Sequence, residues 1–190
     1  ADLLGFSQKQ QSKVIYFNAE DPIDEIQRRV LAICDSYNID QSRLINQLFI
    51  ASGREEELIL AEGNDGLINE AAFAKIEDFC LKHDVDVLAA DPLANMTTSP
   101  ETNEVFKLLG KRVSQLADKC NISVEVVHHT RKLNGREASV EDSRGGSALI
   151  NAVRAARSLN GMSPDEAIKA GLDTHINHFR IETGGKNNLS

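Results

Sequence analysis

The chain has 190 residues, of which 41% are hydrophobic and 26% are charged, and its formal net charge is −8. This composition is typical of a soluble globular domain, and no apolar stretch approaches the roughly 18 residues that a membrane-spanning helix needs. The negative charge excludes a protein that coats nucleic acid through bulk positive charge, so we expect one domain over residues 1–190, with partners recognised locally.

Predicted strands and helices alternate along the chain, and each follows from the spacing of its apolar residues. In chain order, we expect a strand at 13–19, helices at 23–37 and 42–48, short strands at 48–51 and 58–61, a helix at 68–83, a strand at 85–91, a helix at 102–119, and strands at 121–127, 152–159 and 176–182. A short helix begins at Ser163, because serine, proline and glutamate stand at the cap and in the first turn. We expect strands 48–51 and 58–61 to pair as an edge hairpin.

The order of these elements predicts the α/β class. Crossovers of this length join parallel strands, so the most economical architecture is a mostly parallel twisted sheet with helices on both faces and a C-terminal antiparallel extension. Cys34, Cys80 and Cys120 are odd in number, far apart and placed in predicted helices. They therefore favour a reducing, cytoplasmic setting over a disulfide framework or a metal-binding cysteine pair.

Three predicted strands end in polar groups. Glu20 and Asp21 follow the first strand, Asp91 ends the strand at 85–91, and His128 and His129 follow the strand at 121–127. Parallel strands bring their carboxyl ends to one edge, where ligands of open α/β sheets bind. An acid that holds magnesium, an acid that polarises water and a polar sensor of phosphate are the groups that nucleotide hydrolysis requires. The alternative is that turns begin there and polar residues simply follow strands.

Two other interpretations of these residues are weaker. Adjacent histidines on a strand point to opposite faces, and no cysteine or nearby histidine completes a metal site around His128 and His129. A response-regulator receiver domain also has an acidic pair and an aspartate at strand ends, with Asp91 then accepting a phosphoryl group. That domain predicts a shorter chain and a later lysine, and the paired histidines do not fit it.

Five segments resemble the RepA-like branch of the RecA-type P-loop ATPases. They are residues 15–22, 91–94, 127–132, 144–149 with Arg154, and 186–188. The resemblance covers nearly the whole chain, and it implies a RecA-like P-loop NTPase fold that binds ATP and Mg²⁺ and hydrolyses ATP. It also implies a homo-oligomer, often a hexameric ring, and family members serve as DNA helicases in plasmid and phage replication.

The resemblance implies a role for each acid and for one histidine. Asp91 resembles the acid that holds magnesium, and Asp21 resembles a residue that lies beside the nucleotide. Glu20 resembles the residue that orients the attacking water, and His129 the sensor of the γ-phosphate.

Two cations resemble residues that act on a neighbouring subunit's nucleotide. Arg154 resembles the family's arginine finger, which stabilises charge in the transition state. Lys186 is a second candidate for this role. The alternatives are that Arg154 is a solvated strand residue and that Lys186 is an ordinary tail lysine.

A polar loop at residues 130–141 follows the two histidines. Arg131, Lys132 and Arg136 lie in it, and the resemblance implies that this loop faces the central channel of a ring, where single-stranded DNA is held through its phosphates. The loop has no aromatic residue to stack on bases. The alternative is a charged loop that is merely solvated.

The phosphate-loop motif of the family, G-x-x-x-x-G-K-[ST], is absent. Both Gly-Lys pairs, at residues 110–111 and 185–186, lack the first glycine and the final hydroxyl residue. We expect the motif, with its strand and helix, upstream of Ala1, which would leave the strand at 121–127 on an open edge. Without it the chain would bind nucleotide weakly, and the alternative function is a catalytically silent ring subunit or adaptor.

Overall fold

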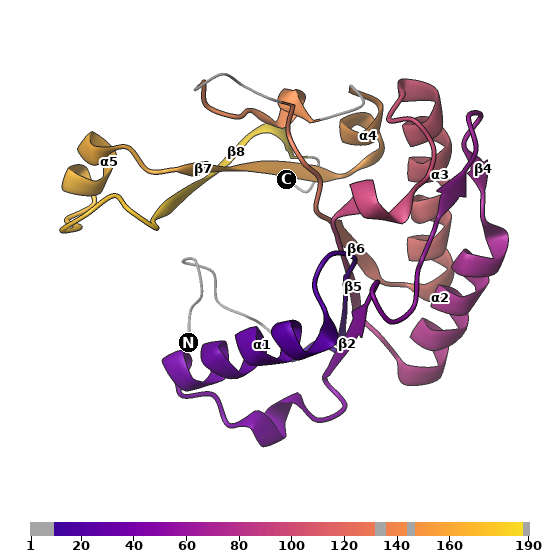
Figure 1. The fold of residues 1–190 in the computed structure, drawn as a ribbon, viewed down its shortest axis with the longest axis horizontal. Helices are drawn as coiled ribbons and strands as arrows, with labels where there is room; N and C mark the ends of the chain where they lie inside the picture. The colour runs from indigo at the N-terminus through magenta and orange to yellow at the C-terminus, as the bar shows by residue number, and fades with distance from the viewer. Residues whose placement is uncertain (1–9, 132–135, 144–146, 188–190) are drawn as a thin grey trace. The chain divides into compact units, whose positions relative to one another are not determined.

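The computed structural model describes residues 10–131, 136–143 and 147–187. These residues cluster into two compact units, and Figure 1 traces the chain through both. The first unit takes the described residues within 1–100 and 112–128, and the second those within 101–111 and 129–190. None of the helices in the described ranges combines the length and hydrophobicity of a membrane-spanning segment. The expectation of a single domain over the chain stays a prediction.

The first unit is built on a sheet of four parallel strands. They are β1 (Val14–Asn18), β2 (Leu48–Ser52), β5 (Val87–Asp91) and β6 (Ser123–Val126). Their order across the sheet is β2-β1-β5-β6, and all neighbours run parallel. Short apolar runs rich in β-branched residues suit strands covered on their faces, and the predicted parallel α/β sheet is confirmed.

Three long helices flank this sheet. They are α1 (Ile23–Tyr37), α2 (Glu70–His83) and α3 (Asn103–Cys120), close to the predicted bounds. In Figure 1, α1 lies on one side of the strands and α2 on the other. Asp24 and Glu25 lie in the first turn of α1, where their negative charges interact favourably with the positive end of the helix dipole. Asn38 then ends the helix in the left-handed conformation, with a φ of 53°.

Aromatic and charged contacts fix α2 against its neighbours. Phe79 of α2 packs edge to face on Phe49 of β2, with ring centroids 5.3 Å apart. Arg112 of α3 lies over the ring of Phe73, 4.4 Å from its centroid, and pairs with the buried carboxylate of Glu77 at 2.9 Å. The second half of α3 is thereby tied to α2, and Lys119 contributes a second ion pair to Glu77 at 2.5 Å.

The predicted edge hairpin between residues 48–51 and 58–61 is wrong. β2 pairs in parallel with β1, while β3 (Ala61–Glu62) pairs antiparallel with β4 (Leu67–Ile68). The turn between β3 and β4 contains Gly63 and Gly66, whose φ angles of 69° and 68° suit glycine better than other residues. The tight turn therefore forms after residue 61, and the charged segment before it does not act as a hairpin turn.

The second unit contains the predicted antiparallel extension. β7 (Ala155–Gly161) pairs with β8 (Phe179–Asn187), and α5 (Pro164–Lys169) lies between them in the chain. Ser163 and Glu166 form the predicted capping box at the start of α5. The strand predicted at 152–159 begins later, because residues up to Ala152 form a short helix, α4 (Ser147–Ala152), in which alanine and leucine favour the helical conformation.

Three short 3₁₀ helices complete the described structure. η1 (Gln41–Leu44) replaces the helix predicted at 42–48, η2 (Leu93–Met96) follows β5, and η3 (Val140–Asp142) lies in the second unit. Asp40 caps η1 by accepting a hydrogen bond from the Ser42 N–H. Each of these short helices lies in a connection between longer elements of the chain.

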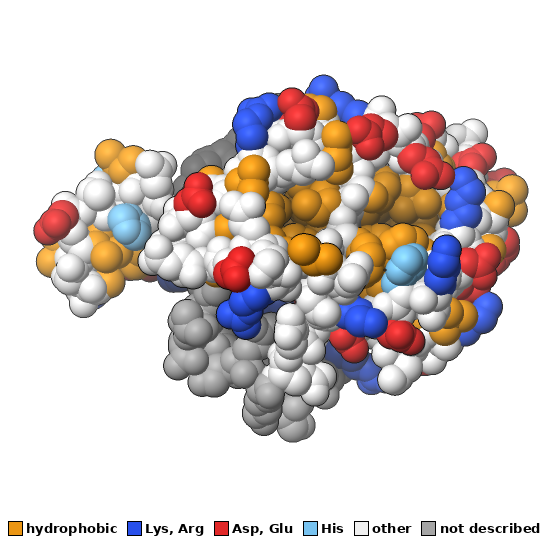
Figure 2. Space-filling view, turned by 90° about the horizontal axis from the view of Figure 1, so that it is seen from below, with side chains coloured by type: hydrophobic (Ala, Val, Ile, Leu, Met, Phe, Trp, Pro, Cys, Tyr) orange, Lys and Arg blue, Asp and Glu red, His pale blue; other side chains and the backbone are white. Residues whose placement is uncertain are grey.

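Hydrophobic side chains also reach the surface. Figure 2 shows them gathered on the face seen from below, with charged side chains around them. Leu31, Ile33 and Tyr37 are the large exposed apolar residues of α1. β6 lies on one edge of the described sheet, as expected, and both Ser123 and Glu125 on it are exposed. A charge on an edge strand opposes pairing with another chain.

Candidate functional site

The carboxyl ends of β1 and β5 lie side by side where the strand order of the sheet reverses. From β1 the chain passes to β2 on one side, and it returns to β5 on the other side of β1. Asn18 ends β1 in register with Asp91 of β5 and with Ser52 of β2. Loops that leave such a position diverge and open the crevice where α/β proteins bind ligands. The fold therefore places Asp91 at the edge of the sheet where α/β proteins commonly bind ligands.

Asn18 organises the loop that carries the first two acids. Its side chain is buried, and its Oδ1 accepts hydrogen bonds from the backbone N–H of Glu20 at 2.9 Å and of Asp21 at 2.7 Å. Its Nδ2 donates to Tyr16 Oη at 3.0 Å and to Asp21 Oδ2 at 3.4 Å. Both ends of the buried amide are thus satisfied, and they fix the loop after β1.

Tyr16 links β1 to the acid of β5. Its hydroxyl donates to Asp91 Oδ2 at 2.8 Å. The pKa of Tyr16 is raised, chiefly by burial; the hydrogen bond from Asn18 opposes this, and the hydrogen bond to Asp91 and the charge of Asp91 add to it. The phenol therefore stays protonated near neutral pH and acts as a donor. Within the described residues, no hydrogen bond reaches the other carboxylate oxygen of Asp91.

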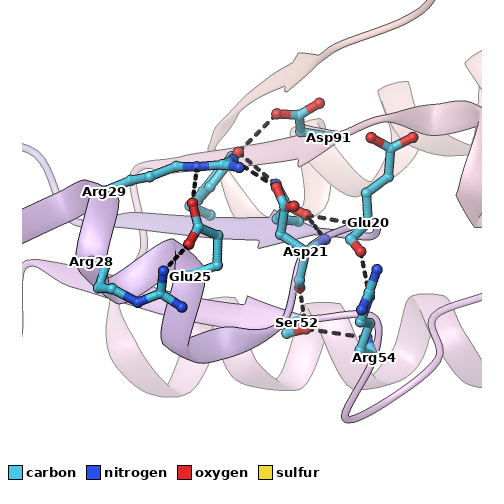
Figure 3. A network of polar contacts seen from close by, with 10 residues as sticks. Glu20, Asp21, Glu25, Arg28, Arg29, Ser52, Arg54 and Asp91 are labelled. Atoms are coloured by element: carbon cyan, nitrogen blue, oxygen red, sulfur yellow. Dashed lines mark hydrogen bonds and ion pairs between the residues drawn. The ribbon is translucent and has the colours of Figure 1, made fainter.

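Asp21 is held by a cation of α1. Arg29 donates to Asp21 Oδ2 at 2.6 Å and to Glu25 Oε1 at 3.0 Å, and Arg28 also pairs with Glu25. Figure 3 shows Arg29 lying beside Asp21. Asp21 raises the pKa of Arg29, which keeps the guanidinium charged. Since one oxygen of Asp21 accepts from both Arg29 and Asn18, the geometry favours a structural role for this acid at the site.

The loop after β2 supports the loop after β1. Ser52 Oγ donates to the backbone oxygen of Asp21 at 2.7 Å, and Gly53 N–H donates to the backbone oxygen of Asn18 at 2.8 Å. Arg54 Nε donates to the backbone oxygen of Glu20 at 2.6 Å. Glu20 is therefore fixed at its N–H by Asn18 and at its carbonyl by Arg54.

The side chain of Glu20 is exposed at this edge. Figure 3 shows its carboxylate extending from the loop to the same side as Asp91. Asn95 Nδ2 donates to Glu20 Oε1 at a long 3.4 Å. A fixed backbone and an exposed carboxylate suit a group that binds or orients water.

The donor set fits magnesium held together with a phosphate ligand. Mg²⁺ in nucleotide sites is bound through one or two carboxylates, with phosphates and water completing the shell. Asp91 offers such a carboxylate, half-buried and oriented by Tyr16. A cluster of three or more metal-ligating side chains is absent from the described residues.

The remaining predicted catalytic residues belong to the second unit. His128 is the last residue of the first unit, just beyond β6, and the next residue, His129, is exposed and belongs to the second unit. Arg154 is exposed in the bend between α4 and β7. Lys186 pairs through its backbone with Ala156 in the β7–β8 ladder, and its side chain lies outside what the structure describes. Their roles stay predictions.

The predicted DNA-contacting loop is partly described, and Lys132 lies outside the described residues. Arg131 is exposed; its N–H donates to the Asp142 backbone oxygen at 2.9 Å. Arg136 forms a two-pronged ion pair with the buried carboxylate of Asp142, at 2.6 and 3.1 Å. Arg136, together with Ser139, holds the pKa of Asp142 well below its ordinary range. Arg136 is thus used within the fold, whereas the guanidinium of Arg131 makes a weaker contact, at 3.2 Å, to a backbone oxygen of Glu141.

Sequence reasoning missed Tyr16, Asn18 and Arg29. A signal for the first two is present, because they are polar residues two positions apart in an otherwise apolar strand and therefore share one face. Arg29 lies on the predicted helix without such a signal. Only the docking of α1 brings it to Asp21.

A family model described as the AAA domain matches residues 2–135 of the chain. The matched segment includes all four strands of the parallel sheet and the loops that carry Glu20, Asp21 and Asp91. No curated protein matches the chain.

Proposed function

Because this chain belongs to the AAA domain family of P-loop ATPases, we propose that it binds ATP with Mg²⁺ at the carboxyl edge of β1 and β5. There it hydrolyses ATP and releases the γ-phosphate. The observation that carries this proposal is the register of Asn18 with Asp91. It brings the Glu20 loop and the Asp91 carboxylate to the switch point of the sheet, where ligands of this fold class bind.

Each acid has one task in the proposed site. The Oδ1 side of Asp91 would hold magnesium, while Tyr16 keeps the other oxygen in place. Magnesium bound there would neutralise the charge that develops on the phosphates. Glu20 would orient water and accept its proton, since its backbone is fixed and its carboxylate is exposed.

We further propose that the chain is a RepA-like motor, which acts as a replicative DNA helicase in a homo-oligomeric ring. In this proposal His129 senses the phosphate and Arg154 reaches a neighbour's nucleotide. Exposure of both residues supports these roles. For the nucleic-acid loop, Arg131 and Lys132 are better candidates than Arg136, because Arg136 is paired with Asp142.

Replacement of Glu20 by glutamine in the complete protein tests the proposal. Glu20→Gln keeps the shape of the side chain but removes its proton-accepting charge, so ATP binding should persist while turnover falls by about a hundredfold or more. The exposed Glu57→Gln in the loop after β2 is the matched control and should keep both properties.

Unchanged turnover in Glu20→Gln would remove Glu20 from this role. If the unmodified protein binds ATP and assembles but shows no hydrolysis, the alternative of a catalytically silent ring subunit or adaptor replaces the motor.

A further inference from the structure

We propose that Tyr16 and Asn18 are positioning residues of this site, which hold the Asp91 carboxylate and the Glu20 loop in one fixed arrangement. We call the hydrogen-bonded series Asp21–Asn18–Tyr16–Asp91 the β1 bridge. This inference deepens the proposed function and rests on it, because the bridge matters only if Asp91 receives a metal-bound phosphate. Neither Tyr16 nor Asn18 is expected to contact the substrate.

The bridge is continuous and runs across the switch point. Asn18 Nδ2 donates to Asp21 Oδ2 at 3.4 Å and to Tyr16 Oη at 3.0 Å, and Tyr16 Oη donates to Asp91 Oδ2 at 2.8 Å. Tyr16 and Asn18 project from the same face of β1, since they are two residues apart on a strand. The bridge thereby connects the loop after β1 to the end of β5 through side chains, in addition to the backbone ladder.

The donor directions determine what the bridge can do. The hydroxyl hydrogen of Tyr16 is directed at Asp91 because the Asn18 amide supplies a hydrogen to the same oxygen. One carboxylate oxygen of Asp91 is thus committed to Tyr16, and the carboxylate cannot rotate freely. Mg²⁺ requires near-ideal octahedral geometry. A carboxylate that is already fixed loses little rotational freedom when it binds this ion.

Asn18 couples this orientation to Glu20. Its Oδ1 holds the N–H of Glu20 while its Nδ2 holds Tyr16, and the side chain is only 4% exposed. An aspartate at position 18 would keep the acceptor but replace the donor with a second negative oxygen facing Tyr16 and Asp21. The proposal therefore predicts a specific defect for Asn18→Asp, which has nearly the same volume as the original residue.

The first experiment measures the bridge without relying on turnover. Protein labelled with carbon-13 at tyrosine Cζ is compared at one neutral pH, and the resonance that disappears in Tyr16→Phe is assigned to Tyr16. Asp91→Asn should shift this resonance, because the charged acceptor of the phenol is lost, and Asn18→Asp should shift it because a second charged acceptor appears. Mg²⁺ with ATP should shift it in the unmodified protein and not in Asp91→Asn. Tyr37→Phe, which removes an exposed tyrosine of α1, serves as the control.

The second experiment measures the Mg²⁺ concentration that gives half-maximal ATP hydrolysis. Tyr16→Phe keeps the ring but loses the hydrogen bond to a charged group, so this concentration should rise about tenfold, with the KM for ATP at saturating Mg²⁺ little changed. Asn18→Asp should show the same defect, and the two changes together should cost less than the sum because they act through one bridge.

The outcomes separate this inference from the proposed function. A Tyr16 resonance that is identical in Asp91→Asn and the unmodified protein overturns the bridge, whatever the turnover. A loss of kcat in Tyr16→Phe that is the same at every Mg²⁺ concentration also overturns it, since a merely structural role would act in this way. If the unmodified protein hydrolyses no ATP but the resonance responds to Asp91→Asn and to Mg²⁺ with ATP, the bridge stands and the proposed hydrolysis fails.

Discussion

Replacing Gly53 with alanine should displace the loop that carries Glu20, although position 53 belongs to another strand's loop. A Cβ at Gly53 would lie 2.9 Å from the Cα of Ala19 and 3.2 Å from its carbonyl oxygen. Ordinary contacts begin at 3.4 Å, and both opposing atoms belong to the backbone, so neither can rotate away. The two loops must therefore move apart by about 0.5 Å, which strains the hydrogen bonds from Gly53 to Asn18 and from Ser52 to Asp21.

We expect Gly53→Ala to lower the free energy of unfolding by about 1–3 kcal/mol, the cost of forcing an extra methyl group into a packed site. For a chain of this size, each kcal/mol lowers the melting temperature by about 2–4 °C. Urea unfolding and thermal melting measure this loss. ATP turnover should fall even at temperatures where the variant is still folded, because Glu20 moves with the loop.

Gly161→Ala is the matched control for this substitution. A Cβ at Gly161, the last residue of β7, would meet no atom of the described residues within 4 Å, and the φ of Gly161 is not in the left-handed region. This variant should keep the stability of the unmodified chain. Equal stability of Gly53→Ala and Gly161→Ala would refute the close approach of the two loops and, with it, the support that we assign to the Glu20 backbone.

Two ion-pair predictions concern stability. Glu77→Ala leaves Arg112 and Lys119 without their shared buried carboxylate, and urea unfolding should show a loss on the order of 3 kcal/mol; an unchanged midpoint would mean that these pairs contribute nothing. Asp142→Asn should flatten the acid dependence of stability. Because Arg136 lowers the pKa of Asp142, this pair stabilises the fold above about pH 4 and is lost as the pH falls below that value. Denaturation followed from neutral to acid pH checks this, and an equally steep decline in Asp142→Asn would contradict it.

The parallel sheet could be predicted because its signals are local. The segment before Asp91 is short, apolar and stopped by proline, and the helix at residues 23–37 has its acids in the first turn. Such patterns are determined by burial on two faces of a strand or on one face of a helix. They can therefore be recognised in the sequence of the segment itself, without knowing which elements pack against it. The edge hairpin failed for the same reason, because pairing depends on which strand lies alongside, and that information is not local.

The acids of the site were also predictable, and their environment was not. A carboxylate after a strand predicts a place at the edge of a parallel sheet, which is where Glu20 and Asp91 lie. By contrast, Arg29 reaches Asp21 only because α1 packs against the sheet. Arg136, predicted to contact nucleic acid, pairs instead with Asp142, because the fold buries that carboxylate nearby.

The sequence by itself determined the class of fold, the edge at which we propose that the chemistry takes place and the identity of the acids there. The tertiary structure alone decided that Asn18 and Tyr16 connect those acids, because a hydrogen bond depends on distances of about 3 Å that the packing of β1 against β5 sets. Periodicity along a chain specifies which face a residue occupies; it does not specify which group from another segment will meet it.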